Sequence, residues 1–353
     1  MDDKIKVLQQ IYSWMEDDES KEIYLNRLNF VISHDYKYMR NIISKYVPDM
    51  AALNDSEIPK LLKKIPKEQK FILYGAGEDA RANLCYFIND ERFLGFCDYD
   101  TQKQVMGVDG VRVISPEQLL QDKACTIIIS THRGYDAIRE FLLKNGVNGE
   151  RIFSMGPYMF AMQKEQYFNP DFMTFEEEVF VDAGCCDLGT TLRLKQHCKK
   201  LKRVYAFEPD KSNYETCIKA AEKNFDKDVI RTYCKGTWSK RKTLYFSATS
   251  DGSSCISESG TECIEVITID EVVDPNERVT FIKMDVEGSE LESLKGAENT
   301  IRRDKPKLAI CIYHKPEDMY EIPLFIKHIV PEYMLYMRHH SNGDGETALY
   351  AIP

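Results

Sequence analysis

Apolar runs that stop at an acidic residue or a glycine recur along this chain from residue 70 onward. In the middle of the chain, an apolar run that includes Val179 and Val181 ends at Asp182, and Gly184 follows. Further along, the apolar run 204–207 ends at Glu208. A strand, a glycine-containing loop, a helix and a second strand that ends in a carboxylate are typical of a nucleoside pocket in a doubly wound α/β sheet.

The part of the chain before residue 67 has a different pattern. Residues 1–66 place apolar side chains at helical spacing, for example at Leu8, Ile11, Tyr12 and Met15. We therefore expect a helical N-terminal segment over 1–66.

Residues 67–157 predict a small Rossmann-like α/β domain, because short apolar runs alternate with helical patterns. The predicted strands are 70–74, 93–97, 111–114 and 125–130, and the predicted helices are 80–90, 135–144 and one that starts at Ser115-Pro116. The first strand leads into Gly75-Ala76-Gly77, and Asp98 follows the second strand. This loop is a loose version of a dinucleotide fingerprint.

Residues 158–178 are aromatic and acidic, and we expect them to form a connector. Residues 179–353 predict the second and larger α/β domain. Its further strands are expected at 229–234, 244–247, 264–269, 279–284, 307–313, 333–337 and 347–352, and its helices at 213–225, 290–302 and 316–330. The segments 244–247 and 264–269 should pair across a polar stretch, 247–261, which we interpret as a lid over an acceptor site.

Composition and charge exclude several classes of protein. The 353 residues carry a formal net charge of -10, and no cluster of Lys and Arg suggests a nucleic-acid partner. No apolar run reaches the roughly 18 residues that a membrane span needs, and the N-terminus lacks the order of a signal peptide. The eleven cysteines are scattered without zinc-site spacing, so we expect reduced thiols in a cytoplasmic protein.

The first group of candidate site residues surrounds the predicted nucleoside pocket. Gly184 would let the backbone approach a ligand, and the helix that follows would present free amide groups. Asp182 could accept a hydrogen bond from the ligand's amino group or brace the loop. Glu208, at the end of the second strand, is placed to bind both ribose hydroxyls.

The second group follows the strand predicted at 279–284. Asp285 comes at the carboxyl end of a central strand, at the switch point of the sheet, and Glu287 and Lys283 flank it. Ser289 and Glu292 have the spacing of a capping box for the next helix. His314 ends the next strand and is a candidate general base.

A metal site at the second group is not expected from the sequence. Asp285 and Glu287 are two positions apart at a strand end, and we expect their carboxylates to point to opposite faces. We therefore predict catalysis by Asp285, His314 and Glu287 without a metal ion.

The second half of the chain is similar in its motifs to a known family. The chain from residue 179 resembles the FkbM-type S-adenosylmethionine-dependent methyltransferases, a class I Rossmann-like fold. The resemblance rests on short motifs at 180–184, 207–210, 236–239, 268–271, 282–290, 313–318 and 336–340. Among them, Phe-Glu-Pro (207–209) together with Asp-Val-Glu-Gly (285–288) is the most specific combination. Family members have a glycine at the position of Leu188, whereas here the glycine comes one position later, at Gly189.

The resemblance implies S-adenosylmethionine as the cofactor and O-methylation of a hydroxyl on a sugar, glycoconjugate or secondary metabolite. It implies that the cofactor is held by a set of residues in three segments: Asp182, Gly184, Asp187, Gly189, Glu208, Gly236, Thr237 and Trp238. The last three would flank the adenine. A small-molecule or glycan acceptor is the expected partner, and the acceptor hydroxyl must lose its proton to a base.

Two alternatives stay open at this level. The protein could be a non-catalytic nucleotide-binding or regulatory protein that keeps the methyltransferase fold. The small domain resembles N-terminal nucleotide-sugar-binding domains of sugar-modifying enzymes. It would then bind a nucleotide-linked ligand, or serve only for docking or formation of a homodimer. An oxidoreductase that uses the loop 75–77 leaves the whole second half of the chain unexplained.

Overall fold

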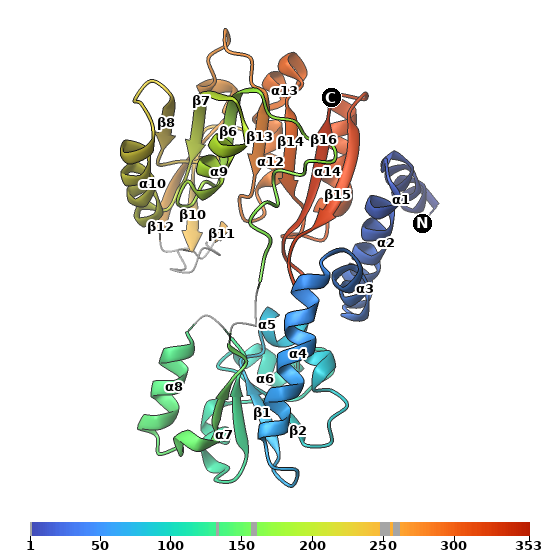
Figure 1. The fold of residues 1–353 in the computed structure, drawn as a ribbon, viewed down its shortest axis with the longest axis vertical. Helices are drawn as coiled ribbons and strands as arrows, with labels where there is room; N and C mark the ends of the chain where they lie inside the picture. The colour runs from blue at the N-terminus through green and yellow to red at the C-terminus, as the bar shows by residue number, and fades with distance from the viewer. Residues whose placement is uncertain (1, 132–133, 157–160, 248–254, 257–261) are drawn as a thin grey trace. The chain divides into compact units, whose positions relative to one another are not determined.

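The computed structural model describes residues 2–131, 134–156, 161–247, 255–256 and 262–353 (Figure 1). The chain divides into two compact units, and each is discontinuous in sequence. The large unit comprises Met1–Tyr24, Lys164–Arg338 and Glu346–Pro353, and the small unit comprises Leu25–Gln163 and His339–Gly345. Among the described residues, no helix combines the length and the apolar character that crossing a membrane requires.

Four helices form the N-terminal region and confirm the helical prediction: α1 (Asp2–Trp14), α2 (Asp18–Ser33), α3 (Lys37–Tyr46) and α4 (Pro48–Lys64). The start of this region belongs to the large unit, where Arg338 forms an ion pair with Asp17 at 2.6 Å. The rest belongs to the small unit, where the Tyr36 hydroxyl donates to Asp344 at 2.8 Å. The segment 339–345 therefore completes the small unit although it lies close to the C-terminus.

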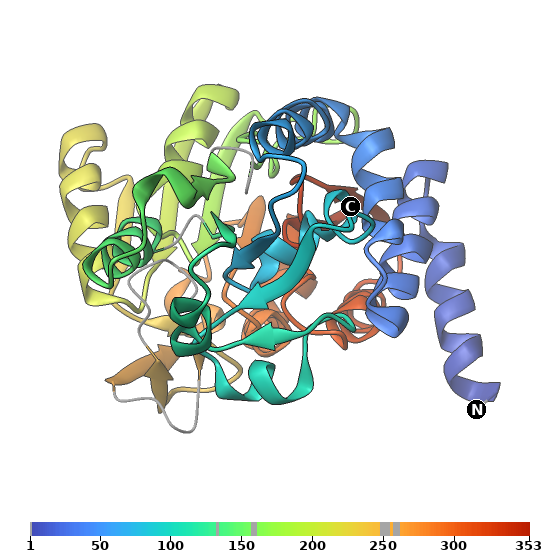
Figure 2. The same ribbon diagram turned by 90° about the horizontal axis from the view of Figure 1, so that it is seen from below.

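The small unit contains a parallel sheet in the order β3-β2-β1-β4-β5, with its switch point between β1 and β4 (Figure 2). Its strands are β1 (Phe71–Tyr74), β2 (Phe93–Cys97), β3 (Val113–Ile114), β4 (Thr126–Ile129) and β5 (Ile152–Ser154). Its further helices are α5 (Glu78–Ala82), α6 (Thr101–Met106), α7 (Pro116–Gln121) and α8 (Tyr135–Lys144). Two separate apolar clusters cover the two faces, one with Leu61 of α4 and the other with Leu142 of α8.

Of two helix predictions in the small unit, one is confirmed and the other gives a helix that is too long. The helix start at Ser115 is confirmed, because Ser115 and Gln118 form a complete capping box. The helix expected at 80–90 is shorter: α5 ends at Ala82, and a 3-10 turn at Leu84–Tyr86 follows. Asn83 separates the two, and its side chain bonds back to the carbonyl of Asp79 at 2.8 Å.

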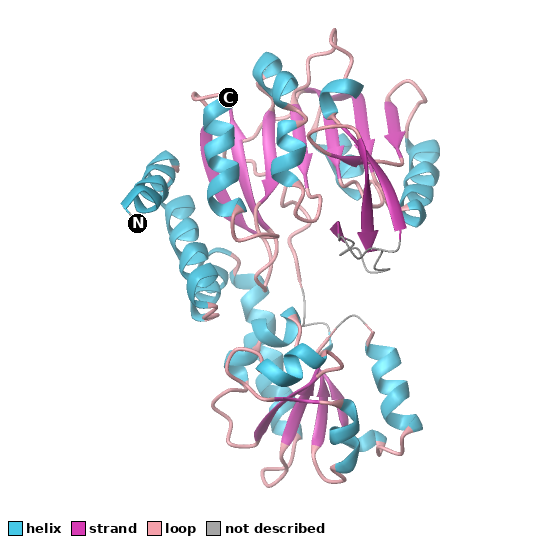
Figure 3. Cartoon of the chain, turned by 180° about the vertical axis from the view of Figure 1, so that it is seen from behind, coloured by secondary structure: helices cyan, strands magenta, loops and turns pink. Residues whose placement is uncertain are grey.

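The large unit contains a seven-stranded sheet in the order β15-β16-β14-β13-β6-β7-β8 (Figures 1 and 3). Its strands are β6 (Glu177–Ala183), β7 (Lys200–Phe207), β8 (Ile230–Tyr233), β13 (Phe281–Met284), β14 (Lys307–Cys311), β15 (Met334–His339) and β16 (Thr347–Ile352). The strands from β14 to β8 pair in parallel, and β16 is antiparallel to β14. The predicted doubly wound α/β fold is confirmed, with its switch point between β6 and β13.

Helices α9 (Gly189–His197) and α10 (Lys211–Asn224) share an apolar cluster with the sheet residues Phe180 and Phe281. Helices α12 (Glu290–Lys295), α13 (Glu298–Asp304) and α14 (Asp318–Ile329) lie on the opposite face (Figure 3). A short helix, α11 (Ile269–Val272), and a four-stranded sheet complete the unit: β9 (Gly236–Thr237), β10 (Lys242–Ser247), β11 (Cys255–Ile256) and β12 (Glu262–Ile267). The predicted pairing of β10 with β12 is confirmed. The stretch 247–261 interpreted as a lid lies mostly outside the described residues.

Two expectations about the segment after β13 are wrong. The single helix expected at 290–302 is split into α12 and α13 around Gly296, where a Cβ atom would lie 2.0 Å from the carbonyl oxygen of Trp238. Because the two backbones come this close at Gly296, the helix is interrupted there. Ser289 makes no capping hydrogen bond, because its backbone (φ -105°, ψ 11°) is not in the extended conformation of an N-cap.

Candidate functional site

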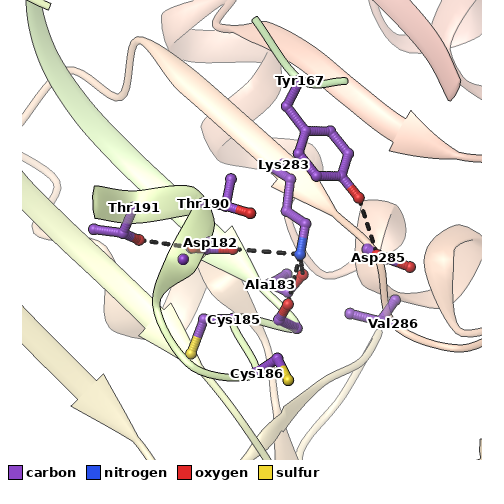
Figure 4. Close-up of polar contacts among 12 residues, drawn as sticks. Tyr167, Asp182, Ala183, Cys185, Cys186, Thr190, Thr191, Lys283, Asp285 and Val286 are labelled. Carbon is purple, nitrogen blue, oxygen red and sulfur yellow. Dashed lines mark hydrogen bonds and ion pairs between the residues drawn. The ribbon is translucent and has the colours of Figure 1, made fainter. Parts of the chain in front are cut away.

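Asp182 lies at the end of β6, fully buried, and is held by two contacts (Figure 4). Its Oδ2 accepts a hydrogen bond from the Thr191 hydroxyl of α9 at 2.7 Å, and its Oδ1 lies 3.4 Å from Nζ of Lys283. The Lys283 ammonium also donates to the carbonyl of Gly184 at 2.5 Å. Of the two predicted roles for Asp182, these contacts provide the bracing of the loop; contact with a ligand stays a prediction.

The loop after β6 has an unusual backbone. Gly184 has φ +77°, and a Cβ atom there would lie 1.8 Å from the carbonyl oxygen of Asp285, so this glycine permits contact between two loops. Cys186 (φ +50°) and Leu188 (φ +66°) also adopt the left-handed conformation, which costs a non-glycine residue about 1–2 kcal/mol. Leu188 thus occupies the position that favours glycine, and its side chain is fully buried in the core.

Two other predicted loop residues form a local turn. Oδ1 of the exposed Asp187 accepts a hydrogen bond from the amide of Gly189 at 2.8 Å, which starts α9. Asp187 is exposed, so its carboxylate also stays accessible to a ligand.

Glu208 ends β7 beside this loop. Its Oε2 accepts from the amide of Cys186, and its Oε1 from the amide of Asp210, both at 2.9 Å. Burial raises the pKa of Glu208, and its side chain stays oriented by these two amides. Each carboxylate oxygen has a second lone pair, so the residue fits the recognition of a ribose diol, and the glycine loop next to it fits a nucleoside.

The three residues predicted to flank an adenine have different surroundings. Gly236 lies beside the end of β7, where a Cβ atom would be 3.9 Å from Cβ of Pro209. Thr237 is buried, and its hydroxyl is 2.6 Å from that of Ser293. The ring of Trp238 packs with the small sheet and carries Lys242 over its face at 4.4 Å. Of the three, Gly236 is the one beside the end of β7. The role of all three at an adenine stays a prediction.

Asp285, Glu287 and His314, the three predicted catalytic residues, come together after β13 and β14. Nε2 of His314 lies 3.6 Å from Oδ1 of Asp285 and 3.5 Å from Oε2 of Glu287. The expectation that the two carboxylates diverge is wrong, because β13 ends at Met284 and Glu287 has φ +53°. The turn brings Glu287 back to the side of Asp285.

The structure adds four residues that the sequence did not single out. Glu290, at the start of α12, is fully buried with Oε1 2.9 Å from Nδ1 of His314. The hydroxyl of Tyr167 donates to Oδ2 of Asp285 at 2.9 Å (Figure 4), and that of Tyr313 lies 3.5 Å from Oδ1. Tyr313 also donates to Glu346 at 3.2 Å. Glu290 stood in the quoted motif at 282–290, but Tyr167 gave no signal because it comes from the predicted connector.

Electrostatics in this cluster are shifted strongly. Burial and the charges of Asp285 and Glu290 raise the pKa of Glu287 to about 7. Burial alone would lower the pKa of His314, but the carboxylates of Glu290, Asp285 and Glu287 raise it to about 10. Despite burial, Lys283 and His314 lower the pKa of Asp285. Negative charge is thus concentrated around one imidazole.

Comparison with known families separates the two units. Residues 182–341 match the model of the methyltransferase FkbM domain, and residues 67–153 match the model of the C2185-like N-terminal domain. The first match lies in the large unit apart from its last residues, and it includes all the site residues that the sequence predicted. A search of curated proteins finds no match.

Solved structures resemble the chain at low sequence identity. A methyltransferase FkbM from Methylobacillus flagellatus is 18% identical, with 86% of this chain and 98% of that chain covered and a TM-score of 0.48. A putative methyltransferase from Streptococcus mutans in complex with SAH is 12% identical, covering 53% and 96%, with a TM-score of 0.34. Fibrillarin from Aeropyrum pernix with natively bound S-adenosyl-L-methionine is 10% identical, covering 50% and 67%, with a TM-score of 0.31.

Proposed function

We propose, from the methyltransferase FkbM domain that residues 182–341 form, that the large unit is an S-adenosylmethionine-dependent O-methyltransferase. Its acceptor is a hydroxyl group of a sugar, a glycoconjugate or a secondary metabolite. Asp182, Gly184, Glu208 and Gly236 belong to the cofactor side of the site. Asp285, Glu287 and His314 belong to the acceptor side.

One observation carries this proposal: the two sides of the site touch. Gly184 approaches the carbonyl of Asp285 so closely that no side chain fits between them. Glu208 holds the same loop through the amide of Cys186. A ligand on the loop therefore lies next to the carboxylates and the imidazole at the switch point of the sheet, where ligands of open α/β sheets bind.

The chemistry follows from this arrangement. S-adenosylmethionine supplies a methyl group on a sulfonium, whose C–S bond breaks as the C–O bond to the acceptor forms, with the electron pair left on sulfur. The residues orient the acceptor oxygen toward the methyl carbon, which is mainly a positioning effect. Of the three predicted catalytic residues, Glu287 is suited to take up the hydroxyl proton, because its pKa is raised to about 7. The imidazole of His314, with a pKa of about 10, already carries a proton near neutral pH. Tyr167 orients Asp285 beside them.

For the small unit we propose binding of a nucleotide-linked ligand. The amide of Ala76 donates to Oδ2 of Asp98 at 2.8 Å, so the loop after β1 is tied to the acid after β2. The same tie exists in the large unit between Cys186 and Glu208. Calorimetric titration with nucleoside diphosphates and nucleotide sugars tests this, and absence of binding by the folded protein contradicts it.

The first experiment for the large unit is calorimetric titration with S-adenosylmethionine and S-adenosylhomocysteine. We expect binding by the wild type and at least a tenfold loss in Glu208→Ala. Acceptor sugars and glycans are then tested for release of S-adenosylhomocysteine. A folded wild type that binds neither cofactor form would reject the enzyme and favour a non-catalytic protein.

A further inference from the structure

The cluster at the acceptor side has the composition of a cation site. Asp285, Glu290 and His314 each offer one ligand atom, and these three atoms lie within 4.8 Å of one another. In an octahedral site with bonds of about 2.1 Å, neighbouring ligands are about 3 Å apart. Adjustment of the side chains is therefore enough to bring the three donors around one ion.

A second and independent observation is the state of the buried donors. Glu290 is fully buried, and its Oε2 has no hydrogen-bond partner. The His314 side chain is only 10% exposed, and neither ring nitrogen makes a hydrogen bond, although carboxylate oxygens lie nearby. Buried polar groups are normally paired, so these unpaired atoms in one cluster point to a missing ligand.

The other oxygens of the two carboxylates are already oriented. Oδ2 of Asp285 accepts from the Tyr167 hydroxyl, and Oε1 of Glu290 accepts from the amide of Val286 at 2.9 Å. Ligating carboxylates in metal sites are characteristically held by such contacts. They leave Oε2 of Glu290 without a partner, and Oδ1 of Asp285 with only the long hydrogen bond of 3.5 Å from the Tyr313 hydroxyl.

The balance of charge also favours a cation. Three cations, Lys283, Lys315 and the protonated imidazole of His314, face five carboxylates that interact with His314 or with one another: Asp285, Glu287, Glu290, Asp318 and Glu346. Lys283 is shared with Asp182, and Lys315 donates to the carbonyl of Gly288. Negative charge remains in excess within a largely buried volume.

We propose that Asp285, Glu290 and His314 bind one divalent cation of the Mg²⁺–Mn²⁺ class. Carboxylates suit both ions, and the imidazole favours Mn²⁺. This inference rests on the proposed function for its purpose: a cation in this position binds the acceptor oxygen and lowers the pKa of its hydroxyl. Glu287, at the edge of the cluster, then faces the acceptor.

Direct binding of Mn²⁺ tests the inference without any turnover. The full-length protein, treated with EDTA and dialysed, is titrated with MnCl₂ and followed by calorimetry and by the electron paramagnetic resonance signal of free Mn²⁺. We expect one saturable site. Glu290→Gln keeps an acceptor for the Val286 amide and should weaken binding at least tenfold, as should His314→Gln. Glu292→Gln, on the same helix but bonded to Lys295, is the matched control and should bind normally.

Each outcome decides the matter. Folded wild type that binds no Mn²⁺ at millimolar concentration, equal weakening by Glu292→Gln, or binding of Zn²⁺ without Mn²⁺ would overturn the inference. Asp285→Asn serves if a ligand variant fails to fold. Cofactor titration in EDTA separates the two proposals. Binding of Mn²⁺ without cofactor binding rejects the proposed function alone. Methyl transfer in EDTA at an unchanged rate rejects the cation alone.

Discussion

The two doubly wound sheets of this chain share one hydrogen bond between a loop and an acid, but the residues at the ends of their central strands differ. In both units, the loop after the first strand donates an amide to the acid after the second: Ala76 to Asp98, and Cys186 to Glu208. One strand further, the units diverge. The register places Leu73 beside Ile128 in the small unit, and Asp182 beside Lys283 at the corresponding positions of the large unit.

The difference extends to the residue after the central strand. Ser130 follows β4, and its hydroxyl donates to the carbonyl of Gly75 at 2.8 Å. Asp285 follows β13, and Lys283 serves the corresponding carbonyl of Gly184. The small unit shows that an apolar pair and a serine complete this scaffold. The buried charges of the large unit are therefore not required by the fold, which favours a role in the site.

The largest effect is expected from breaking the buried ion pair. Lys283→Ile leaves Asp182 as an unpaired buried charge, which should cost about 3–5 kcal/mol of the free energy of unfolding. The double variant Asp182→Leu/Lys283→Ile copies Leu73 and Ile128 and should recover most of that loss while losing methyl transfer. Urea denaturation measures both. A double variant as unstable as the single one would mean that the two switch points are not equivalent.

The two loop glycines sharpen the comparison. Gly184→Ala places a Cβ atom against the backbone of Asp285 and should destabilise the protein by more than 2 kcal/mol, in the range of overpacked sites. Gly75→Ala meets no atom nearer than Cβ of Thr131 at 3.4 Å, and its cost is the positive φ, about 1–2 kcal/mol. Thermal unfolding of both variants gives the order, and equal losses would contradict it.

The paired acids should separate the ligands of the two units. Glu208→Ala removes the charged acceptor for a ribose, worth about 1.5–3 kcal/mol of cofactor binding. Asp98→Ala should leave the affinity for S-adenosylmethionine unchanged, as calorimetry can verify. If Asp98→Ala weakened the binding of S-adenosylmethionine as much as Glu208→Ala does, the assignment of the cofactor to the large unit would be wrong.

The smallest effect concerns two serines before helices. Ser115→Ala breaks a complete capping box and should cost about 1 kcal/mol. Ser289→Ala removes no capping bond and should change the free energy of unfolding by less than about 0.5 kcal/mol. Comparable losses in denaturant titrations would show that Ser289 caps α12 after all.

Part of the fold and of the candidate site could be predicted from the sequence. The switch point at Asp285, the acids that follow the strands and the position of His314 at a strand end followed from the apolar runs. The turn at Glu287 did not, because a left-handed glutamate has no sequence signature. Nor did Tyr167, whose contact with Asp285 spans 118 residues. Glu290 was not predicted as a site residue, because the capping-box spacing of Ser289 and Glu292 already accounted for the start of its helix.

The segment 339–345 has a consequence for biosynthesis. Asp344 and Asn342 bond to Tyr36 and Asn54, so the small unit, most of which is made before the large unit, waits for its last contacts until residues 339–345 have been made. The nascent chain must keep this unit in an incomplete state while the large unit is made. Neither unit can be obtained whole by a single cut, and a fragment that ends at residue 163 should be less stable than the same residues within the full chain.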